Sequence, residues 1–508
     1  MTRASEALAA TLLALGLLAG CEVGPDFLRP AAPPVTSYTP EPLATKTAAA
    51  DVPAGQAQRF TDGLDIPGEW WTLFHSAPLD QLIAEALKAN PSLAAAQAAL
   101  REARENVYAE EGALFPSVTA NGSATREKVS GASFGNPGLS STLGVTTASL
   151  NVSYALDVFG GVRRQIESLE AEEEFQRFQL EAAYLSLTSN VVVAAVGEAS
   201  LRAQVAATED IIQIETQELG VLQKQLELGG ASKAAVLAQQ ATLSQAQATL
   251  PPLQRQLAQT RNQLAALAGH YPSEVPAGKF ELATMHLPDD LPLSLPSKLV
   301  EQRPDVRAAE AELHAASANI GVATANQLPQ FNITGQLGTS SLGFAQLFSP
   351  GTGIWSIGGS VAQTVFDAGT LLHKKRAAVA AYEQAAASYR NTVLTAFQNV
   401  ADALRALQSD ADAVKAQAEA VHSAADSLAI SRDQYQAGAI TYTALLAAEQ
   451  TYQQARIALV QAQANRFADT AALFQALGGG WWNRSDIAAN KAGEPERFWL
   501  PPLPPAKN

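Results

Sequence analysis

The sequence contains one cysteine and few charged residues, and both shortages restrict what the protein can be. A single cysteine excludes a disulfide framework within one chain and any zinc site built on several cysteines. Charged side chains make up only 16% of the 508 residues, whereas hydrophobic residues make up 47%. The formal net charge of −15 argues against nucleic acid as a partner, because binding to phosphates needs clustered Lys and Arg.

Long hydrophobic runs and catalytic motifs are also scarce. After Cys21 no apolar run approaches the length of a membrane-spanning helix, so we expect no transmembrane helix, and crossing a membrane would require β-strands. The sequence contains no His-Glu-x-x-His or phosphate-loop pattern, and its six histidines are scattered without ligand spacing. We therefore expect no catalytic residues, no metal site and no cofactor.

The N-terminal segment up to Gly20 has the pattern of an export signal. Arg3 is followed by a short apolar stretch that ends in Leu18-Ala19-Gly20-Cys21, too short to span a bilayer as a mature helix. This ending resembles the bacterial lipobox, which implies cleavage before Cys21 and acylation of that residue, for example with palmitate. Several acyl chains on one residue give a stable anchor. Glu22 follows, in place of the Asp that tends to retain lipoproteins at the inner membrane, and favours delivery to the outer membrane. The alternative is an ordinary signal peptide with an incidental cysteine.

Beyond residue 66 the chain repeats one plan twice. Asn90-Pro91 and Arg303-Pro304 each open a helical segment, which ends at Phe115-Pro116 in one copy and at Leu328-Pro329 in the other, with identical spacing. Each copy continues with an alternating hairpin segment, a very long helical pattern, a glycine turn and a second helix. The matching order indicates an internal duplication.

These signals set the predicted boundaries. We assign residues 1–20 to the signal peptide, 21–66 to an acylated N-terminus and a tether rich in Pro and Ala, 67–290 to the first repeat, 291–480 to the second and 481–508 to a C-terminal tail. In the first repeat we expect helices, a hairpin at about 116–157 and a long coiled-coil helix pair at about 162–268. In the second we expect a helix at about 304–327, a hairpin at about 329–366 and a long helix pair at about 368–477.

The long helices are the clearest physical signal. No proline occurs from Val162 to Leu228, and apolar residues recur there every seven positions, for example at Ile212 and Leu219. A helix of about 65 residues is roughly 100 Å long. The helices alone are equally typical of a soluble coiled coil.

The hairpin segments favour a membrane protein. Each alternates apolar with polar residues over about ten positions, as in Phe331, Ile333, Gly335 and Leu337 against Asn332, Thr334 and Gln336. Such strands suit a barrel with lipid outside and water within. A half-buried soluble sheet would alternate in the same way, but these hairpins interrupt pairs of rods on an exported, lipid-anchored chain, and that context favours the barrel.

The number of strands predicts the assembly. Four strands cannot close a barrel, and open edges are not tolerated in hydrocarbon. Two chains would supply about eight strands, whose interior side chains fill, whereas three would supply twelve, wide enough for a pore. We therefore expect an α+β membrane protein, a trimer whose 12-stranded outer-membrane β-barrel has four strands per chain and continues into a long α-helical periplasmic barrel.

The ordered motifs resemble outer-membrane lipoproteins of the TolC-like outer membrane factor family, and most closely its NodT-type efflux lipoproteins. The resemblance rests on Cys21-Glu22-Val23-Gly24-Pro25-Asp26-Phe27, Trp70-Trp71, Asp157-Val158-Phe159-Gly160, the two X-Pro helix starts and the two glycine turns, and it covers the chain from Cys21 to about Gly480. It implies a homotrimeric exit duct for small molecules such as drugs in the outer membrane, lipid-anchored and extending into the periplasm. It also implies a periplasmic adaptor and an inner-membrane pump, commonly of the resistance-nodulation-division class.

In such proteins the tips of the helix pairs form the periplasmic entrance. By the match of the turns, the tips lie near Gly229 and Gly438. Family members often carry an Asp after each turn, but the matching positions here hold Ala235 and Ala447. The resemblance therefore does not imply a carboxylate gate here, and we expect an apolar constriction formed by Leu445 or Leu446 with Tyr442 nearby. The alternative is that both leucines only pack between helices.

Two other classes of protein remain as alternatives. A lipoprotein scaffold could tether envelope layers through coiled coils, but it has no use for paired strands with a lipid-ready face. A lipid-anchored hydrolase would need a nucleophile in a strand-to-helix turn, and the single Gly-x-Ser-x-Gly match, at residues 131–135, lies inside the predicted hairpin segment instead. The sequence does not specify the exported compound (drug, metal, oligosaccharide or protein), the adaptor and pump, or the way the entrance is gated.

Overall fold

The computed structural model describes residues 22–130, 132, 135, 140–274 and 279–485. The predicted signal peptide, Cys21 and most of the C-terminal tail lie outside these residues. The chain folds into two compact units, one formed by Met1–Pro30, Ala98–Arg177 and Ala308–Asn391, the other by Ala31–Gln97, Phe178–Arg307 and Thr392–Asn508. Each unit takes segments from both sequence copies, so the compact units do not coincide with the repeats.

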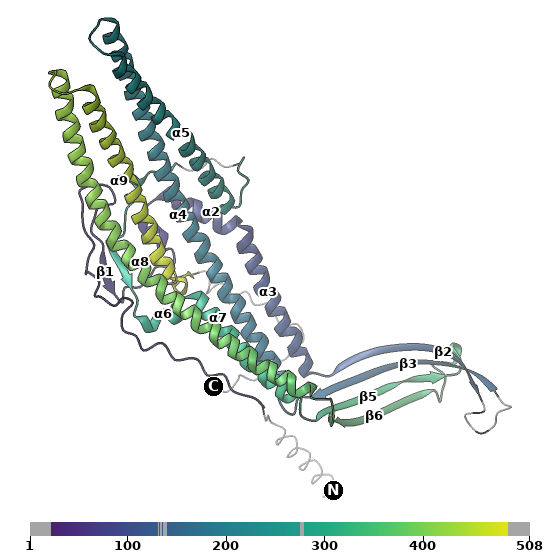
Figure 1. The fold of residues 1–508 in the computed structure, drawn as a ribbon. Coiled ribbons are helices and arrows are strands. Elements are labelled where there is room, and N and C mark those ends of the chain that lie inside the picture. Colours follow the sequence, from purple (N-terminus) through teal and green to yellow (C-terminus); the bar gives the residue numbers. More distant parts are fainter. Residues whose placement is uncertain (1–21, 131, 133–134, 136–139, 275–278, 486–508) are drawn as a thin grey trace. The chain divides into compact units, whose positions relative to one another are not determined.

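Four long helices dominate the chain, two from each copy (Figure 1). Helices α4 (Gly161–Glu227) and α8 (Thr370–Gln436) have 67 residues each. Helices α5 (Lys233–Leu267) and α9 (Tyr442–Ala476) have 35 residues each. The number of residues between the starts of α4 and α8 equals the number between the starts of α5 and α9. The long helices and the duplication predicted from the sequence are confirmed.

Helix α4 contains the most apolar long stretch among the described helices. This helix contains an 18-residue window of mean hydropathy 1.4, long and apolar enough by length and composition to cross a membrane. Of that window, 56% is buried inside the chain, and a buried core helix passes the same test. Polar residues interrupt the apolar run in this window, although its mean hydropathy stays high.

Four antiparallel strands form one sheet in the first unit. They are β2 (Ser117–Ser130), β3 (Ser140–Leu156), β5 (Gln330–Ser341) and β6 (Gly353–Ala362), in the order β2-β3-β5-β6 (Figure 1). Each copy contributes one hairpin, and β3 pairs with β5 across the copies. The strands β2 and β6 are left at the two edges.

Shorter elements complete the two units, and several were not predicted from the sequence. They are β1 (Arg59–Asp62), η1 (Trp70–Phe74), α2 (Ala77–Ala89), α3 (Pro91–Glu111), η2 (Gly112–Leu114), η4 (Leu282–Thr284), β4 (Asp290–Leu293), α6 (Pro296–Gln302), α7 (Pro304–Ala325), η5 (Phe344–Gln346) and η6 (Trp481–Asn483). The strands β1 and β4 form a parallel pair of four residues each. Both are too short to show a sequence period, which explains why they were missed.

The two X-Pro motifs have the same structural role in the two copies. The Nδ2 atom of Asn90 donates to the carbonyl of Leu267, the last residue of α5, at 2.9 Å. Arg303 donates from Nη1 to the carbonyl of Ala476, the last residue of α9, also at 2.9 Å. The last carbonyls of a helix have no hydrogen-bond partner within the helix. Each motif therefore supplies a side-chain donor to the last carbonyl of its copy's second long helix.

The segment from Glu22 to Pro30 packs against the first unit and does not hang free. Its backbone is tied to the loop after β3, where the amide of Val23 donates to the carbonyl of Phe159 at 3.2 Å. Asp26 forms an ion pair with Arg164 at 2.6 Å, and the Phe27 ring stacks on His314 with centroids 4.3 Å apart. The predicted tether is extended at this end, but its side chains hold it to the helices.

Aromatic side chains fill the core of the second unit. Trp70 is 1% exposed and stacks on Phe474 with ring centroids 5.3 Å apart, while Phe74 lies against Phe467. The Trp70-Trp71 motif therefore supports packing around the end of α9. Arg466, which is fully buried in α9, donates to the carbonyls of Ala54 and Gln56 and holds that stretch of the N-terminal segment in place.

Candidate functional site

The four-stranded sheet has one apolar face and one polar face. Pairing places Trp355 opposite Leu337, and Leu337 opposite Leu150, so large apolar side chains align across three strands. These three side chains are 75%, 64% and 50% exposed. The opposite face carries Ser, Thr, Asn and Gln, as in the row formed by Asn151, Gln336 and Ser356. The predicted alternation is confirmed, and it gives a face for lipid and a face for water.

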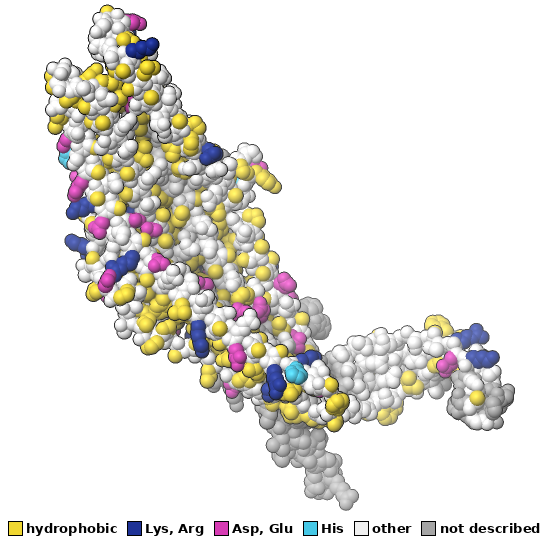
Figure 2. All heavy atoms as spheres, viewed as in Figure 1, with side chains coloured by type: hydrophobic (Ala, Val, Ile, Leu, Met, Phe, Trp, Pro, Cys, Tyr) yellow, Lys and Arg dark blue, Asp and Glu magenta, His cyan; other side chains and the backbone are white. Residues whose placement is uncertain are grey.

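The charged residues of the four strands lie at the end of the sheet farthest from the helices. Arg126, Glu127 and Lys128 lie near the end of β2 that leads into the loop toward β3. In the view shown, Lys, Arg, Asp and Glu side chains occur at that end of the strands and not along their length (Figure 2). The stretch of β2 before Arg126 is close to the length that a tilted strand needs to cross the hydrocarbon. The charges therefore begin where a membrane would end.

The sheet is open at both edges. Strand β2 pairs only with β3, and β6 pairs only with β5, among the described residues. An unpaired strand edge presents free N–H and C=O groups, which hydrocarbon does not tolerate. A sheet with this lipid-ready face therefore requires further strands from other copies of the chain.

Both long helix pairs turn back through the same local structure. Gly229 and Gly438 adopt left-handed backbone angles, with φ of +77° and +72°. The next amide along bonds back to the preceding helix, from Gly230 to Gln225 at 2.7 Å and from Ala439 to Gln434 at 2.8 Å. This is the C-terminal motif that glycine favours, and it explains why both copies carry glycine there.

Each second helix then begins with a hydroxyl cap. The Oγ atom of Ser232 accepts from the amide of Ala235 at 3.1 Å, and Oγ1 of Thr441 accepts from the amide of Ala444 at 3.3 Å. Gly229 and Gly438 are both exposed at the turns. The two predicted tips are therefore exposed, capped helix turns with equivalent geometry.

A buried polar network lies next to the tips and involves all four long helices. The hydroxyl of Tyr442 (α9) lies 2.6 Å from Oε1 of Gln239 (α5) and 3.2 Å from Oε2 of Glu218 (α4). Nε2 of Gln239 donates to the backbone carbonyl of Glu215 at 3.0 Å and also to its carboxylate. Arg432 (α8) pairs with Glu449 (α9) at 3.2 Å.

The carboxylates of this network are held away from water. Glu215 is 0% exposed and Glu449 is 1% exposed. Burial, together with the adjacent Glu449 carboxyl, raises the pKa of Glu218 to about 8. Burial also raises the pKa of Glu215, and the pKa of Tyr442 is raised by burial and by the Glu218 carboxylate. At neutral pH the network therefore retains a proton that an exposed glutamate would release.

This network was not predicted from the sequence, although one signal for it was present. Glu215 occupies the position between Ile212 and Leu219 where a heptad places its second core residue. A carboxylate at such a position predicts a buried polar partner. The partner, Gln239, lies on another helix and carries no pattern of its own.

The residues predicted to form the constriction differ in how far their side chains are exposed. Leu445 and Leu446 are each 5% exposed, so both side chains are used in packing within one chain. Tyr442 is half-buried in the network, Ala235 is half-buried, and Ala447 is exposed. Tyr442 is thus the one predicted tip residue that bonds to another helix pair among the described residues.

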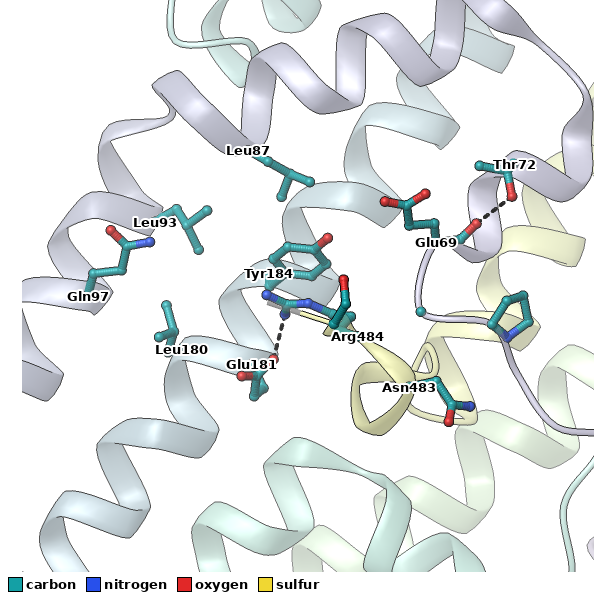
Figure 3. A pocket seen from close by; sticks show the side chains of 13 residues that line it. Glu69, Thr72, Leu87, Leu93, Gln97, Leu180, Glu181, Tyr184, Asn483 and Arg484 are labelled. Carbon is teal, nitrogen blue, oxygen red and sulfur yellow. Dashed lines mark hydrogen bonds and ion pairs between the residues drawn. The ribbon is translucent and has the colours of Figure 1, made fainter. Parts of the chain in front are cut away.

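A separate cavity of about 700 Å³ lies in the second unit. Arg484 lies over the Tyr184 ring, 3.4 Å from its centroid, and pairs with Glu181 at 2.6 Å (Figure 3). Leu87, Leu93 and Leu180 line the other side (Figure 3). Because Arg484 and Glu181 bond to each other, we assign this pair a packing role.

An apolar-faced sheet with two open edges, on a chain that also carries capped helix pairs of equal length, defines an outer-membrane channel assembled from copies of one chain. Comparison with known proteins gives the particular family. Residues 82–270 and 295–479 match the family described as outer membrane efflux protein, one match for each copy. The chain belongs to the outer membrane efflux protein family.

Relatives from several bacteria match nearly the full length. The chain is 30% identical to the probable efflux pump outer membrane protein TtgC of Pseudomonas putida, over 97% of this chain and 99% of the relative. It is 30% identical to the cation efflux system protein CusC of Escherichia coli, over 91% and 96% of the two chains. It is 28% identical to the probable outer membrane lipoprotein SilC of Salmonella typhimurium, over 92% and 97%.

Solved structures agree with this assignment. The outer-membrane channel OprN superposes with a TM-score of 0.80 at 27% identity, covering 91% of this chain and all of OprN. A structure of CusC gives a TM-score of 0.78 at 27% identity, with the same coverage. The protein is therefore one subunit of a trimeric outer-membrane efflux channel, which works with a periplasmic adaptor and an inner-membrane pump.

Proposed function

We propose that the channel is a passive exit duct for small molecules such as drugs, and that the pump chooses the substrate. The lumen-facing rows of the sheet, such as Asn151, Gln336 and Ser356, carry neutral hydroxyl and amide groups, which favour weak selection by charge. Relatives are named for antibiotic, toluene, cation and pyoverdine export, so one duct architecture serves unlike compounds. The observation that carries the proposal is the sheet with a polar inner face and two open edges.

The test is complementation. A host without its own exit duct receives this protein together with the adaptor and pump from its genomic neighbourhood. We expect resistance to the pump's substrates to return, and purified channel to conduct ions in a planar bilayer. An assembled trimer that neither conducts nor restores resistance would instead favour the scaffold hypothesis.

We propose that the chain itself performs no catalysis and holds no metal or cofactor. Its relatives are transport proteins. Among the described residues no group of three His, Cys, Asp or Glu could hold a metal ion. The energy for export then comes from the pump, and purified channel should show no hydrolysis of nucleotides, esters or peptides above that of a buffer control.

We propose that Cys21 carries the acyl chains of a lipid anchor. Cys21 lies outside the described residues, but its neighbours support the proposal. Val23 is bonded to Phe159, in the loop directly after β3, and Arg164 donates to the carbonyl of Val23 at 3.3 Å. Val23 itself is thereby held at the end of the sheet that joins the helices, which supports an anchor attached close to it in the sequence.

Labelling cells with radioactive palmitate tests the anchor. We expect the wild-type chain to be labelled and the Cys21→Ser variant to be unlabelled, with the precursor uncleaved before residue 21. A matched Glu22→Gln variant should retain the label. Equal labelling of wild type and Cys21→Ser would show that the lipid is attached to another residue.

We propose that the tips form the periplasmic entrance and that the network around Tyr442 holds it closed. Two leucines at 5% exposure leave little side chain to line a tunnel, whereas Tyr442 links α9 to α4 and α5. Separating the two helix pairs would break these hydrogen bonds, so the closed arrangement is favoured until the adaptor supplies energy to open it.

Single-channel recording tests this entrance. Tyr442→Phe removes both hydroxyl contacts while retaining the ring, and we expect a higher open fraction than in wild type. Tyr435→Phe is the matched control, because the Tyr435 ring lies 5.5 Å from that of Tyr442 without joining the network. Equal open fractions for all three channels would place the closing contacts elsewhere.

A further inference from the structure

A short basic run lies at the beginning of α8, in a strongly acidic chain. His373, Lys374 and Arg376 are exposed and Lys375 is half-buried. Within the part of the chain that the structure describes, none of the four has an ion-pair partner. The positive end of the helix dipole adds to their charge, so this run is unfavourable for its own helix and would be stabilised by an external anion.

The first copy neutralises its own basic residues at the equivalent place. Arg163 at the beginning of α4 pairs with Asp157 at 3.1 Å, and Arg164 pairs with Asp26 and Glu167, each at 2.6 Å. In the second copy the loop carboxylate, Asp367, instead accepts from the amides of Gly369 and Leu371. The positive charges at the beginning of α8 therefore remain available to pair with an anion outside their own chain.

Acidic residues of opposite charge lie toward the end of α3. Glu102 and Glu105 are exposed and Glu110 is half-buried. None of the three has an ion-pair partner among the described residues, whereas the neighbouring Arg104 pairs with Glu173 at 3.0 Å. These carboxylates lie toward the negative end of their helix dipole, which is again the unfavourable end.

Closing the sheet into a ring brings these two surfaces together. The β6 edge of one copy must meet the β2 edge of the next, since these are the two unpaired edges of the described sheet. Helix α3 ends shortly before β2 and helix α8 begins shortly after β6, so the two helices become neighbours across the seam. Arg376 and Glu105 both lie six positions from the strand-side end of their helices, which is about 9 Å in each case.

The exposed faces of the two helices also allow close approach. On α3 the exposed positions around the glutamates include Ala98 and Ala109, and on α8 those beyond the basic run include Ala377 and Ala380. Small side chains let helix backbones approach, so long charged side chains beside them can reach across. The two helices run in opposite directions relative to the strands, so their dipoles attract as well.

We propose that the basic run of α8 (His373–Arg376) forms ion pairs with Glu105 and Glu110 on α3 of the adjacent copy, and that these pairs seal the seam below the barrel. The inference rests on the closure of the barrel by copies of this chain. It assigns the subunit contact immediately beneath the membrane to charge complementarity, with one such contact in each of the three seams.

Charge reversal on the two sides of the seam tests the proposal. One variant carries Lys374→Glu and Arg376→Glu, a second carries Glu105→Lys and Glu110→Lys, and a third combines all four changes. We expect each of the first two to lower the temperature of trimer dissociation in detergent by about 5 °C, and the third to recover at least half of the loss. Lys233→Glu, an exposed reversal at the tip, is the matched control and should leave this temperature unchanged.

Each other outcome contradicts a different claim. If the combined variant lowers the dissociation temperature by the sum of the two separate decreases, the proposed ion pairs are wrong. If trimer stability falls only for the α8 reversal, and only in vesicles containing phosphatidylglycerol, the basic run binds lipid headgroups and the proposed ion pairs are wrong. If the wild-type protein forms no trimer, barrel closure itself fails, and that result is distinct from a trimer insensitive to charge reversal.

Discussion

Helix pair α4–α5 of the first copy and helix pair α8–α9 of the second have the same lengths, 67 and 35 residues. The equality holds although α5 contains Pro251 and Pro252 and the sequence of α9 contains no proline. The shared features are the ones that begin and end helices: a left-handed glycine at each turn, a hydroxyl cap after it and a side-chain donor at the final carbonyl. Backbone capping therefore sets the length in both copies.

The side chains between these caps have diverged. Leu257 of α5 and Arg466 of α9 occupy corresponding positions, equally far from the start of each helix, and both are buried. The leucine contributes to an apolar core, whereas the arginine binds three oxygen atoms of the N-terminal segment. The hairpins differ too, since strands β2 and β3 have 14 and 17 residues whereas β5 and β6 have 12 and 10. The two copies therefore share the positions of their helix ends and differ in the contacts made between those ends.

The largest expected effect tests whether both copies share one lipid face. Ile357→Arg in the second hairpin and Leu150→Arg in the first each place a charge on the apolar face, in each of three copies. At the membrane midplane such a change costs about 2–4 kcal/mol per site. We expect both variants to lose the trimer from the outer membrane fraction, measured by gel migration before and after heating.

The matched control lies one residue away. Ser356→Arg places the same charge on the polar face, so we expect the trimer to persist and the single-channel conductance to change. Loss of trimer in only one of the two hairpin variants would mean that the copies do not face lipid in the same way.

The second prediction concerns the divergent pair at Leu257 and Arg466. Arg466→Leu gives the second copy the residue of the first, and it leaves the carbonyls of Ala54 and Gln56 without their side-chain donor. Each buried acceptor left unpaired costs about 1–3 kcal/mol. We expect limited proteolysis to cut the segment near residue 54 at least ten times faster.

The control for this prediction is Lys415→Leu, an exposed change on α8 that should leave the cleavage rate as in wild type. Equal protection of residue 54 in Arg466→Leu would show that the β1–β4 pairing, not the arginine, holds the segment.

The sequence predicted the features that repeat with a short period. Heptad spacing indicated α4, alternation indicated the hairpins, and the duplicated glycine turns located the tips. It did not predict the parallel pair of β1 and β4, because two very short strands that lie far apart in the chain leave no local pattern. The network around Tyr442 and Glu218 depends on which helices become neighbours, and spacing along one helix does not give that information.

The basic run at the beginning of α8 was overlooked for a different reason. A net charge of −15 describes the whole chain, whereas a contact depends on the few charges that remain unpaired in one place. Arg163 and Arg164 show the same local sequence signal as Lys374 and Arg376, and only the structure separates the neutralised pair from the available one.

The third prediction uses pH to test the network that joins the two copies near the tips. Glu218 has a pKa of about 8 in the folded state, above the usual value of 4.5. The folded state therefore binds more protons than the unfolded state between these values, and stability declines as pH rises through this window. We expect amide exchange of the tips, corrected for its intrinsic pH dependence, to accelerate from pH 5 to pH 8.5.

Glu218→Gln should flatten this response, since an amide does not titrate. Glu209→Gln on the same helix is the matched control and should retain it. A tip whose corrected exchange is independent of pH in the wild-type protein would show that the carboxyl cluster does not hold a proton across the two copies.

The smallest expected effect compares the two hydroxyl caps directly. Ser232→Ala and Thr441→Ala each remove one cap at equivalent places, and such changes cost about 1 kcal/mol. Because the cap distances are similar, 3.1 Å and 3.3 Å, we expect equal, roughly five-fold faster exchange of the Ala235 and Ala444 amides. The network adds a second restraint at Tyr442, directly after the Thr441 cap, and Lys233 holds the corresponding place in the first copy. A smaller effect for Thr441→Ala, which disappears when Tyr442→Phe is added, would show that the second tip is held by the network more than by its cap.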